Sequence, residues 1–257
     1  MHDKTALARE LPIQAQFPIT PSQDEASKPR ENLMKLYMHP VSMTSRPVRL
    51  FMAEKGLKAD EEVVDLMTGA HFQEPYASLN PNKLVPMLED DGFKLTESSA
   101  ILKYLADKFD LPEYPKDLKQ RARVNEIMDW LNTNFYREWA YGMCYPQLFP
   151  HMKRPDDNVQ KATVEWGKEQ SKRWLQVLND HWIGPNNQYL GGNTITIADY
   201  FGAGLVTLGE LIRCDLTPYP NVVRWLNNVK KLKSWPQVNE VFNGLKDQLK
   251  GQPFVAV

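Results

Sequence analysis

The 257-residue chain changes its hydrophobic periodicity near residue 110, and this change constrains the fold more than any other feature of the sequence. Before residue 110, short strand-like runs alternate with helix-like runs, whereas after residue 119 apolar residues recur at helical spacing. We therefore predict a domain of mixed helix and strand over 33–110 and an all-helical domain over 120–250. A charged segment with two prolines, 111–119, is predicted to link them.

The first domain is expected to begin with a strand, a helix and a second strand. Residues 35–38 form the first strand, and the following helix ends at Gly56, a natural helix C-cap. The second strand is predicted over 62–66. Because a crossover through a helix is right-handed, the two strands are expected to be parallel neighbours.

A hairpin and a helix are expected to complete this domain. Brief strands at 86–89 and 93–96 are joined by Asp90-Asp91-Gly92, a sequence typical of a tight turn. A helix with apolar residues at helical spacing starts near Glu97. The predicted order is therefore β-α-β followed by β-β-α.

The segment 80–102 is predicted to bind a small zwitterionic, peptide-like ligand. Val85 precedes Pro86, and proline restricts the preceding residue to extended geometry, so the amide and carbonyl of Val85 can pair with a peptide. Glu97 and Ser98 open a helix whose unpaired N-terminal amides favour an anion. Each half could instead be structural, as an ordinary Val-Pro loop or a helix cap.

The helical domain carries long apolar faces. One face runs along 124–139 and another along 164–182, and further helices are predicted to begin near Ile197 and Val222. The segment Thr196-Ile-Ala-Asp199 has the spacing of a capping box, with Asp in place of the usual Glu or Gln. We therefore expect a buried helix at Ile197, and a loss of stability when Asp199 is replaced.

Composition excludes several classes of function. The net charge is −1 and charges of both signs are mixed along the chain, which argues against nucleic-acid binding. No apolar run approaches the ~20 residues of a membrane helix and no secretory signal is present, so a cytoplasmic location is expected. Cys144 and Cys214 lack metal or redox spacing, so no metal site is expected. Residues 1–32 are predicted to be a flexible extension.

The loop after the first strand, 39–46, is a candidate for chemistry. A hydroxyl at a helix N-terminus, such as that of Ser42, can donate to a thiolate and hold its pKa below the ~8.5 of a free thiol. The alternative is structural, because Ser42, Thr44 or Ser45 could simply be the N-cap of the following helix.

Over 34–245 the chain resembles the cytosolic glutathione transferases, and the theta class most closely. The resemblance is carried by three segments in the right order, 65–71, 95–105 and 114–126. It implies the glutathione transferase fold, with an α/β thioredoxin-like N-terminal domain and an all-α C-terminal domain. It also implies glutathione as cosubstrate, no metal, a role in detoxification and a homodimer.

The resemblance implies a role for each matching residue. Ser42 matches the catalytic serine that donates to the glutathione sulfur. Val85, before a cis Pro86, matches the residue whose backbone pairs with the cysteinyl part of glutathione. Glu97 and Ser98 match the pair that holds the γ-glutamyl amine and carboxylate.

The resemblance is less complete for the part of the site that would bind the glycine carboxylate of glutathione. His71 matches a theta-class contact to that carboxylate. The family often has a lysine immediately before Val-Pro, where this chain has Leu84, so Lys83 is the candidate to replace it. Tyr37 lies near the catalytic tyrosine of other classes, but a packed strand residue is expected there. No cysteine occurs in the loop, which argues against relatives that form mixed disulfides.

The electrophile is expected to lie against the helical domain, where aromatic and flexible apolar residues are predicted to form a wall. The residues of this wall are Tyr136, Trp139, Tyr141 and Met143, although most of them could equally be core residues. The predicted function is attack of a serine-stabilised thiolate on an alkyl or aralkyl halide, an epoxide or a similar small hydrophobic electrophile. The alternatives are a non-catalytic glutathione-binding or interaction module, and a specialised glutathione-dependent dehalogenase or ether-cleaving lyase.

Overall fold

A computed structural model describes residues 34–257, so the extension predicted over 1–32 lies outside the described residues. Residues 34–257 belong to one compact unit. Its first part contains, in order, β1 (Met34–Met38), α1 (Ser45–Lys55), β2 (Ala59–Val63), a 3-10 turn (Ala70–Phe72), α2 (Tyr76–Leu79), β3 (Met87–Asp90), β4 (Phe93–Thr96) and α3 (Ser98–Lys108). The predicted β-α-β and β-β-α order is therefore correct.

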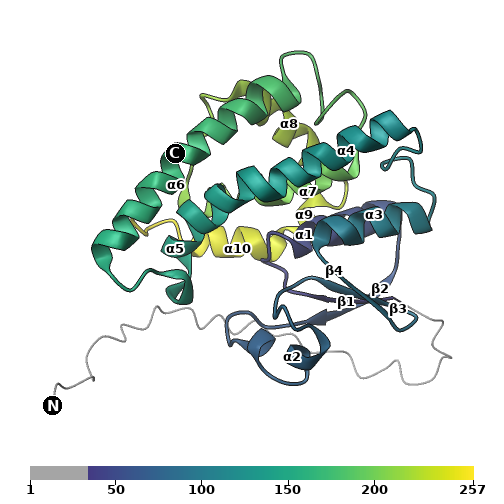
Figure 1. Ribbon diagram of the computed structural model, residues 1–257, viewed down its shortest axis with the longest axis horizontal. Coiled ribbons are helices and arrows are strands. Elements are labelled where there is room, and N and C mark those ends of the chain that lie inside the picture. The colour runs from purple at the N-terminus through teal and green to yellow at the C-terminus, as the bar shows by residue number, and fades with distance from the viewer. Residues whose placement is uncertain (1–33) are drawn as a thin grey trace. The chain divides into compact units, whose positions relative to one another are not determined.

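The four strands form one mixed sheet in the order β2-β1-β3-β4. Strands β1 and β2 are parallel, as predicted, while β3 runs antiparallel to both β1 and β4. Helices α1 and α3 cover one face of the sheet, and α2 lies on the opposite side (Figure 1). The helix α1 ends at Gly56, which has the expected left-handed conformation with φ 64°.

Strand β2 begins and ends three residues earlier than predicted. Its residues Asp60, Glu61 and Glu62 are exposed, because β2 is the edge strand of the sheet. Charged side chains are common on edge strands, where they oppose pairing with other chains. The prediction followed the apolar run at 63–66 instead, and most of that run leads into a turn in which Asp65 accepts the Met67 amide at 2.8 Å.

The second part of the chain is helical from residue 118 onward. It contains α4 (Leu118–Trp130), a π-helical segment (Leu131–Cys144), α5 (Tyr145–Leu148), a 3-10 turn (Pro150–Met152), α6 (Asp157–Val177) with a π-helical end (Leu178–Ile183), α7 (Ile197–Val206), a 3-10 segment (Thr207–Ile212), α8 (Pro220–Val229), α9 (Trp235–Val238) and α10 (Glu240–Gln248). The helix starts predicted at Ile197 and near Val222 are confirmed. Helix α7 packs against both α1 and α3, which joins the two parts through a shared core.

The π-helical segment is pressed against α6 at two glycines. A Cβ atom added to Gly167 would lie 2.4 Å from the backbone carbon of Gly142, so these two backbones are in direct contact. Only glycine permits such an approach. The contact sets the position of the π-helical segment, whose residues form one wall of the pocket described below.

Helix α7 is the buried centre of the helical part. All ten of its residues are buried, and Asp199 at its third position is fully inaccessible. The Asp199 carboxylate accepts hydrogen bonds from the amides of Thr196 and Leu190, both at 2.7 Å, and burial raises its pKa to about 6. The predicted capping box is therefore present, and its carboxylate is also hydrogen-bonded to the backbone of buried Leu190.

Three further predictions concern membrane helices, the two cysteines and metal sites. No helix of residues 34–257 is both long and apolar enough to cross a membrane. Cys144 is buried and Cys214 is partly buried, and both are free thiols. Within the same residues, no group of three or more His, Cys, Asp or Glu side chains is arranged to hold a metal ion.

Candidate functional site

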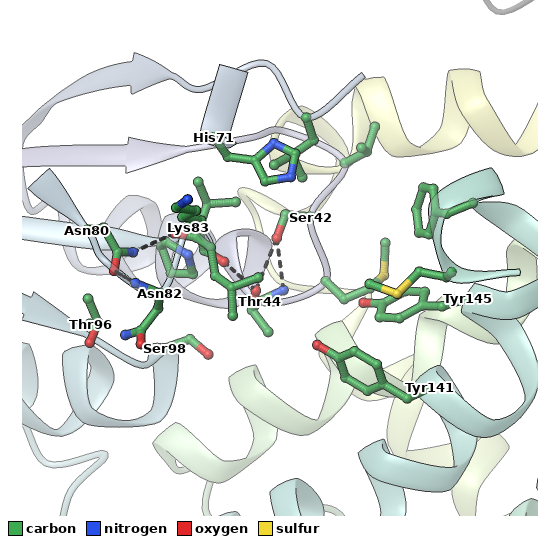
Figure 2. A pocket seen from close by; sticks show the side chains of 18 of the residues that line it. Ser42, Thr44, His71, Asn80, Asn82, Lys83, Thr96, Ser98, Tyr141 and Tyr145 are labelled. Carbon is green, nitrogen blue, oxygen red and sulfur yellow. Dashed lines mark hydrogen bonds between the residues drawn. The ribbon is translucent and has the colours of Figure 1, made fainter. Parts of the chain in front are cut away.

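A pocket of about 740 Å³ opens between the end of the sheet and the helical part (Figure 2). Its polar side is made by loops of the first part, and its aromatic side by the π-helical segment, α5 and the turn after it. The lining residues predicted from the sequence are Ser42, His71, Lys83, Val85, Pro86, Glu97, Ser98, Tyr136 and Tyr141. The pocket therefore brings together the predicted residues of both halves.

The Ser42 hydroxyl lies in the loop just before α1, and its hydrogen bonds leave it only the role of a donor. Its oxygen accepts hydrogen bonds from the amides of Thr44 at 3.3 Å and Ser45 at 3.2 Å, which occupy both lone pairs. The N-cap position of α1 is occupied by Thr44, whose side chain makes no capping hydrogen bond. Because both lone pairs are used, the Ser42 hydroxyl can act only as a donor.

Thr44 connects Ser42 with the Val-Pro loop. Its hydroxyl donates to the Val85 carbonyl at 2.9 Å, and its oxygen lies 3.1 Å from the Ser42 oxygen (Figure 2). Since the Thr44 proton is given to Val85, the bond between the two hydroxyls is donated by Ser42. A thiolate in the pocket has to replace Thr44 as the acceptor of this proton.

The Val85-Pro86 peptide bond is cis, as the resemblance implied. Val85 is buried at the pocket wall, and its carbonyl is held by Thr44. Among the hydrogen bonds of residues 34–257, none is donated by the Val85 amide. One backbone donor is therefore available to a peptide-like ligand at this point.

The turn before α3 has the geometry of an anion site. Glu97 adopts a left-handed backbone conformation with φ 65°, which is rare for a residue other than glycine and is concentrated at functional sites. Ser98 is buried and is the first residue of α3, so the unpaired amides of that helix begin here. The segment can hold a carboxylate through Ser98 and an amine through Glu97.

His71 brings an unsatisfied polar atom to the pocket. Its side chain is 6% exposed, and no partner within residues 34–257 satisfies its Nδ1 atom. Burial lowers the pKa of His71, and the nearby His151 lowers it further, so the imidazole is neutral at pH 7. Buried polar atoms without partners are rare, which fits a ring that completes its bonding with a ligand.

Lys83 and Leu84 both reach the pocket, whereas Tyr37 does not. Lys83 is exposed, has φ 54° and is one of the residues that line the pocket. Leu84 is half exposed at the same wall. Tyr37 is packed beneath the sheet and donates to Glu89 at 3.3 Å, in agreement with the structural interpretation of this residue.

Of the four residues predicted for the aromatic wall, two line the pocket and two do not. Tyr136 and Tyr141 line the pocket, but Trp139 and Met143 are fully buried on the other side of the π-helical segment. Trp139 donates to the Leu205 carbonyl at 3.1 Å, inside the core around α7. In a π-helix, residues five apart share a face, so Tyr136 and Tyr141 point together while the residues between them point away.

Comparisons with known proteins agree with this geometry. Residues 33–107 match the model of the glutathione S-transferase N-terminal domain, and residues 143–233 match that of the C-terminal domain. Glutathione S-transferase theta-1 of Homo sapiens is 34% identical over 181 residues, which are 70% of this chain and 72% of that protein. The chain belongs to the glutathione S-transferase family.

Two further matches are also to theta members of the family. Glutathione S-transferase theta-2 of Rattus norvegicus is 30% identical over 224 residues, which are 84% of this chain and 88% of that protein. A crystal structure of human glutathione transferase theta-2, a complex with glutathione and an unknown ligand, matches with a TM-score of 0.74 and 26% identity. That match covers 87% of this chain and 93% of that chain. The theta-like resemblance, the fold class and the transferase activity predicted from the sequence are therefore confirmed.

Several lining residues of this family member were not anticipated. They are Thr44, Asn82, Thr96, Asn132, Tyr145, Phe149 and His151. Tyr145 and Phe149 continue the row of Tyr136 and Tyr141, each four residues after the previous aromatic residue. This regular aromatic spacing was the sequence signal that could have identified them. The polar residues carry no such signal, because their place in the pocket depends on how loops that are distant in the sequence meet.

Proposed function

We propose that the protein binds glutathione in this pocket and that Ser42 stabilises its thiolate for attack on a small hydrophobic electrophile. The observation that carries the proposal is the Ser42 oxygen, which accepts two backbone amides and so has only its proton left to offer. A hydrogen bond to the charged form of a thiol lowers its pKa and raises the reactive fraction near neutral pH.

The polar side of the pocket supports one contact for each part of glutathione. Glu97 and Ser98 at the start of α3 suit the γ-glutamyl amine and carboxylate, since the helix N-terminus favours an anion. The Val85 amide suits the cysteinyl carbonyl. The neutral His71 and the exposed ammonium of Lys83 suit the glycine carboxylate. The free donors and the orphaned His71 nitrogen thus match a zwitterionic tripeptide.

The electrophile is proposed to lie against Tyr136 and Tyr141 on the aromatic side. The thiolate sulfur forms a bond to an electrophilic carbon, and the leaving group departs with its electron pair. Alkyl or aralkyl halides and epoxides are the proposed substrates. In this proposal residues 33–110 form the glutathione-binding domain and residues 120–250 form the domain that holds the electrophile. Residues 111–119 link the two domains. By family membership we also propose a homodimer in the cytoplasm, with glutathione as cosubstrate.

The proposal is tested by Ser42→Ala, with Ser45→Ala as the matched control. The Ser45 hydroxyl accepts from the His39 amide at 3.4 Å and lies outside the pocket lining. We expect Ser42→Ala to lower kcat/KM for halides and epoxides by about 10²–10³-fold, as for loss of one preorganised donor. The inflection of kcat/KM with pH should also rise toward ~8.5, the value of a free thiol.

Calorimetric titration of glutathione into each variant separates binding from chemistry. The affinity of Ser42→Ala should stay within about fivefold of the parent, because one neutral hydrogen bond contributes roughly 1 kcal/mol. Parent rates in Ser42→Ala would show that the mechanism is wrong. A parent protein that does not bind glutathione would overturn the whole proposal, and binding without turnover of any substrate would favour the non-catalytic module.

A further inference from the structure

The end of the pocket around His71 has an apolar wall. Met67, Phe72 and Leu84 all line the pocket, and their side chains are 44%, 55% and 51% exposed. The Phe72 ring lies against the His71 ring, with the two centroids 3.9 Å apart. Large apolar side chains that stay half exposed in a pocket are available to cover an apolar group of a ligand.

The same end of the pocket carries little positive charge. Among the lining residues, all of which belong to the described part of the chain, Lys83 is the only lysine or arginine, and it is exposed to solvent. Burial lowers the pKa of His71, so its ring adds no charge at pH 7. A neutral imidazole can donate to the carbonyl of an ester or an amide as well as to a carboxylate. The charge of a ligand carboxylate would therefore be matched by one solvent-screened ammonium.

The direction of a bound tripeptide follows from strand β3. Met87 pairs with Thr96, so the chain runs from Leu84 toward the start of α3 at Ser98. A tripeptide with its γ-glutamyl end at Ser98 and its cysteinyl part on Val85 runs in the opposite direction. In such an antiparallel pair, the ligand residue after the cysteine lies opposite Leu84, with Cβ atoms about 4.5–5.5 Å apart.

The backbone of Leu84 is held at this position. Its carbonyl accepts hydrogen bonds from the Asn80 side chain at 2.7 Å and from the Tyr76 hydroxyl. In Figure 2 His71 lies above Ser42, on the side away from Ser98. The leucine side chain offers apolar area to the C-terminal residue of the ligand and cannot form an ion pair with its carboxylate.

We propose that Leu84 makes this pocket accept γ-glutamylcysteinyl thiols with an uncharged, apolar C-terminal group, such as a glycine ester, as readily as glutathione. The inference rests on the proposed glutathione chemistry and widens its thiol substrate class. Loss of the ligand carboxylate removes an exposed ion pair with Lys83, an effect of about fivefold at most. An ethyl group half buried against Leu84 and Phe72 gains about fourfold, the contribution of one buried methylene. The two effects nearly cancel.

The test compares three thiols that differ only at the glycine carboxylate, namely glutathione, its glycine carboxamide and its glycine ethyl ester. The carboxamide removes the charge without adding an apolar group. The ester-to-carboxamide ratio of kcat/KM therefore measures the apolar contact, and the ester-to-glutathione ratio measures the net preference. The electrophile is 4-nitrobenzyl chloride throughout. Calorimetric titration of each thiol gives the same ratios from dissociation constants, without turnover.

The variants are Leu84→Ala, which removes the apolar contact, and Leu84→Lys, which adds a charge at the same position. The control is Leu118→Ala, because Leu118 is 82% exposed at the start of α4 and lies outside the pocket lining. Comparing ratios between variants cancels differences in folded protein and in the intrinsic reactivity of the thiols.

In the parent we expect an ester-to-glutathione ratio within about threefold of one and an ester-to-carboxamide ratio of about four. Leu84→Ala should bring the ester-to-carboxamide ratio close to one. Leu84→Lys should lower the ester-to-glutathione ratio by about tenfold, because it gains an ion pair with glutathione and loses the contact with the ester. Leu118→Ala should keep both parent ratios.

A parent that uses the ester at least tenfold less efficiently than glutathione overturns the proposal and leaves the transferase chemistry standing. Equal ratios in the parent, Leu84→Ala and Leu84→Lys have the same meaning. A change in Leu84→Ala confined to the KM of the halide would assign the apolar wall to the electrophile and overturn the proposal as well. A parent that neither binds nor consumes any of the three thiols overturns both this proposal and the proposed function.

Discussion

The two walls of the pocket are built in different ways. On the sheet side, Ser42 is held by amides two and three residues later, and the Asn80 side chain binds the Leu84 carbonyl at 2.7 Å. On the helical side, the tyrosines are positioned by a π-helical segment and by its glycine contact with α6. The bonds that hold Ser42 and Leu84 in the first wall are local, although the bond from Thr44 to Val85 joins two separate loops. The second wall depends on parts of the chain that are far apart.

The hydrogen bonds that hold the residues around each wall differ in the same way. Short helix α5, which carries Tyr145, is tied to the C-terminal tail because Gln147 exchanges hydrogen bonds of 2.9 and 2.8 Å with the backbone of Val255. Arg46 is bound by Asn239, almost two hundred residues away in the chain. Substitutions in the sheet wall should therefore act on binding and rate, whereas substitutions behind the helical wall should act first on stability.

The largest expected effect is on stability, from Asp199→Ala. The change leaves the amides of Thr196 and Leu190 and the Trp225 indole without their acceptor in the core. We expect a loss of about 3–5 kcal/mol in the free energy of unfolding, because buried donors are left unpaired. The melting temperature should fall by roughly 10 °C, measured by calorimetry, with near-normal glutathione affinity per folded molecule.

A surface carboxylate provides the control for this change. Asp156 caps α6 by accepting the amides of Asn158 and Val159 at 2.9 and 3.0 Å, but water can reach those amides. Asp156→Ala should therefore cost only about 1 kcal/mol. Equal losses in the two variants would remove the distinction between a buried and an exposed cap, and normal stability of Asp199→Ala would refute its structural role.

A smaller effect is expected on the sheet wall, from Thr44→Val. The variant keeps the shape of the side chain but loses the hydrogen bond that holds the Val85 carbonyl, and this loss outweighs the removal of Thr44 as a competing acceptor of the Ser42 proton. We expect kcat/KM to fall by about threefold to tenfold, the equivalent of roughly 1 kcal/mol, with little change in melting temperature. Steady-state kinetics with one halide and thermal melts measure the two quantities.

Thr68→Val is the matched control for Thr44→Val. The Thr68 hydroxyl contacts the Asp65 carbonyl at 3.4 Å on the surface, outside the pocket lining. Its removal should leave both kinetics and stability close to the parent. If Thr44→Val instead lost stability and kept its rate, the sheet wall would depend on packing as much as the helical wall does.

The smallest expected effect concerns the replacement of the family lysine at Leu84. Lys83→Ala should weaken glutathione binding by about twofold to fivefold, because an exposed ion pair contributes at most ~1 kcal/mol. The effect should shrink at high salt, where surface charges are screened. Lys94→Ala on β4 provides a control charge outside the pocket. Unchanged affinity in Lys83→Ala would leave the glycine carboxylate to His71 alone.

The accuracy of the sequence predictions follows the same division between local and distant contacts. The hairpin turn at 90–92, the cap at Gly56 and the capping box at Thr196 were correct, because each depends on a few adjacent residues. Strand β2 was displaced because its charged residues lie on an exposed edge, where an apolar pattern is not required. The positions of Trp139 and Met143 were wrong because the helix there is wider than an α-helix.

Turn residues, caps and periodicity in the amino-acid sequence were enough to predict the two-part fold and the order of its elements, whereas the residues proposed for the polar half of the pocket came from the resemblance to a known family. These features act through bonds between near neighbours, so they can be read before any long-range contact is known. The width of the π-helical segment, the pairing of Tyr136 with Tyr145 and the burial of Arg46 behind them arose only when distant segments packed together. Such packing depends on the joint fit of many side chains, which no local pattern encodes.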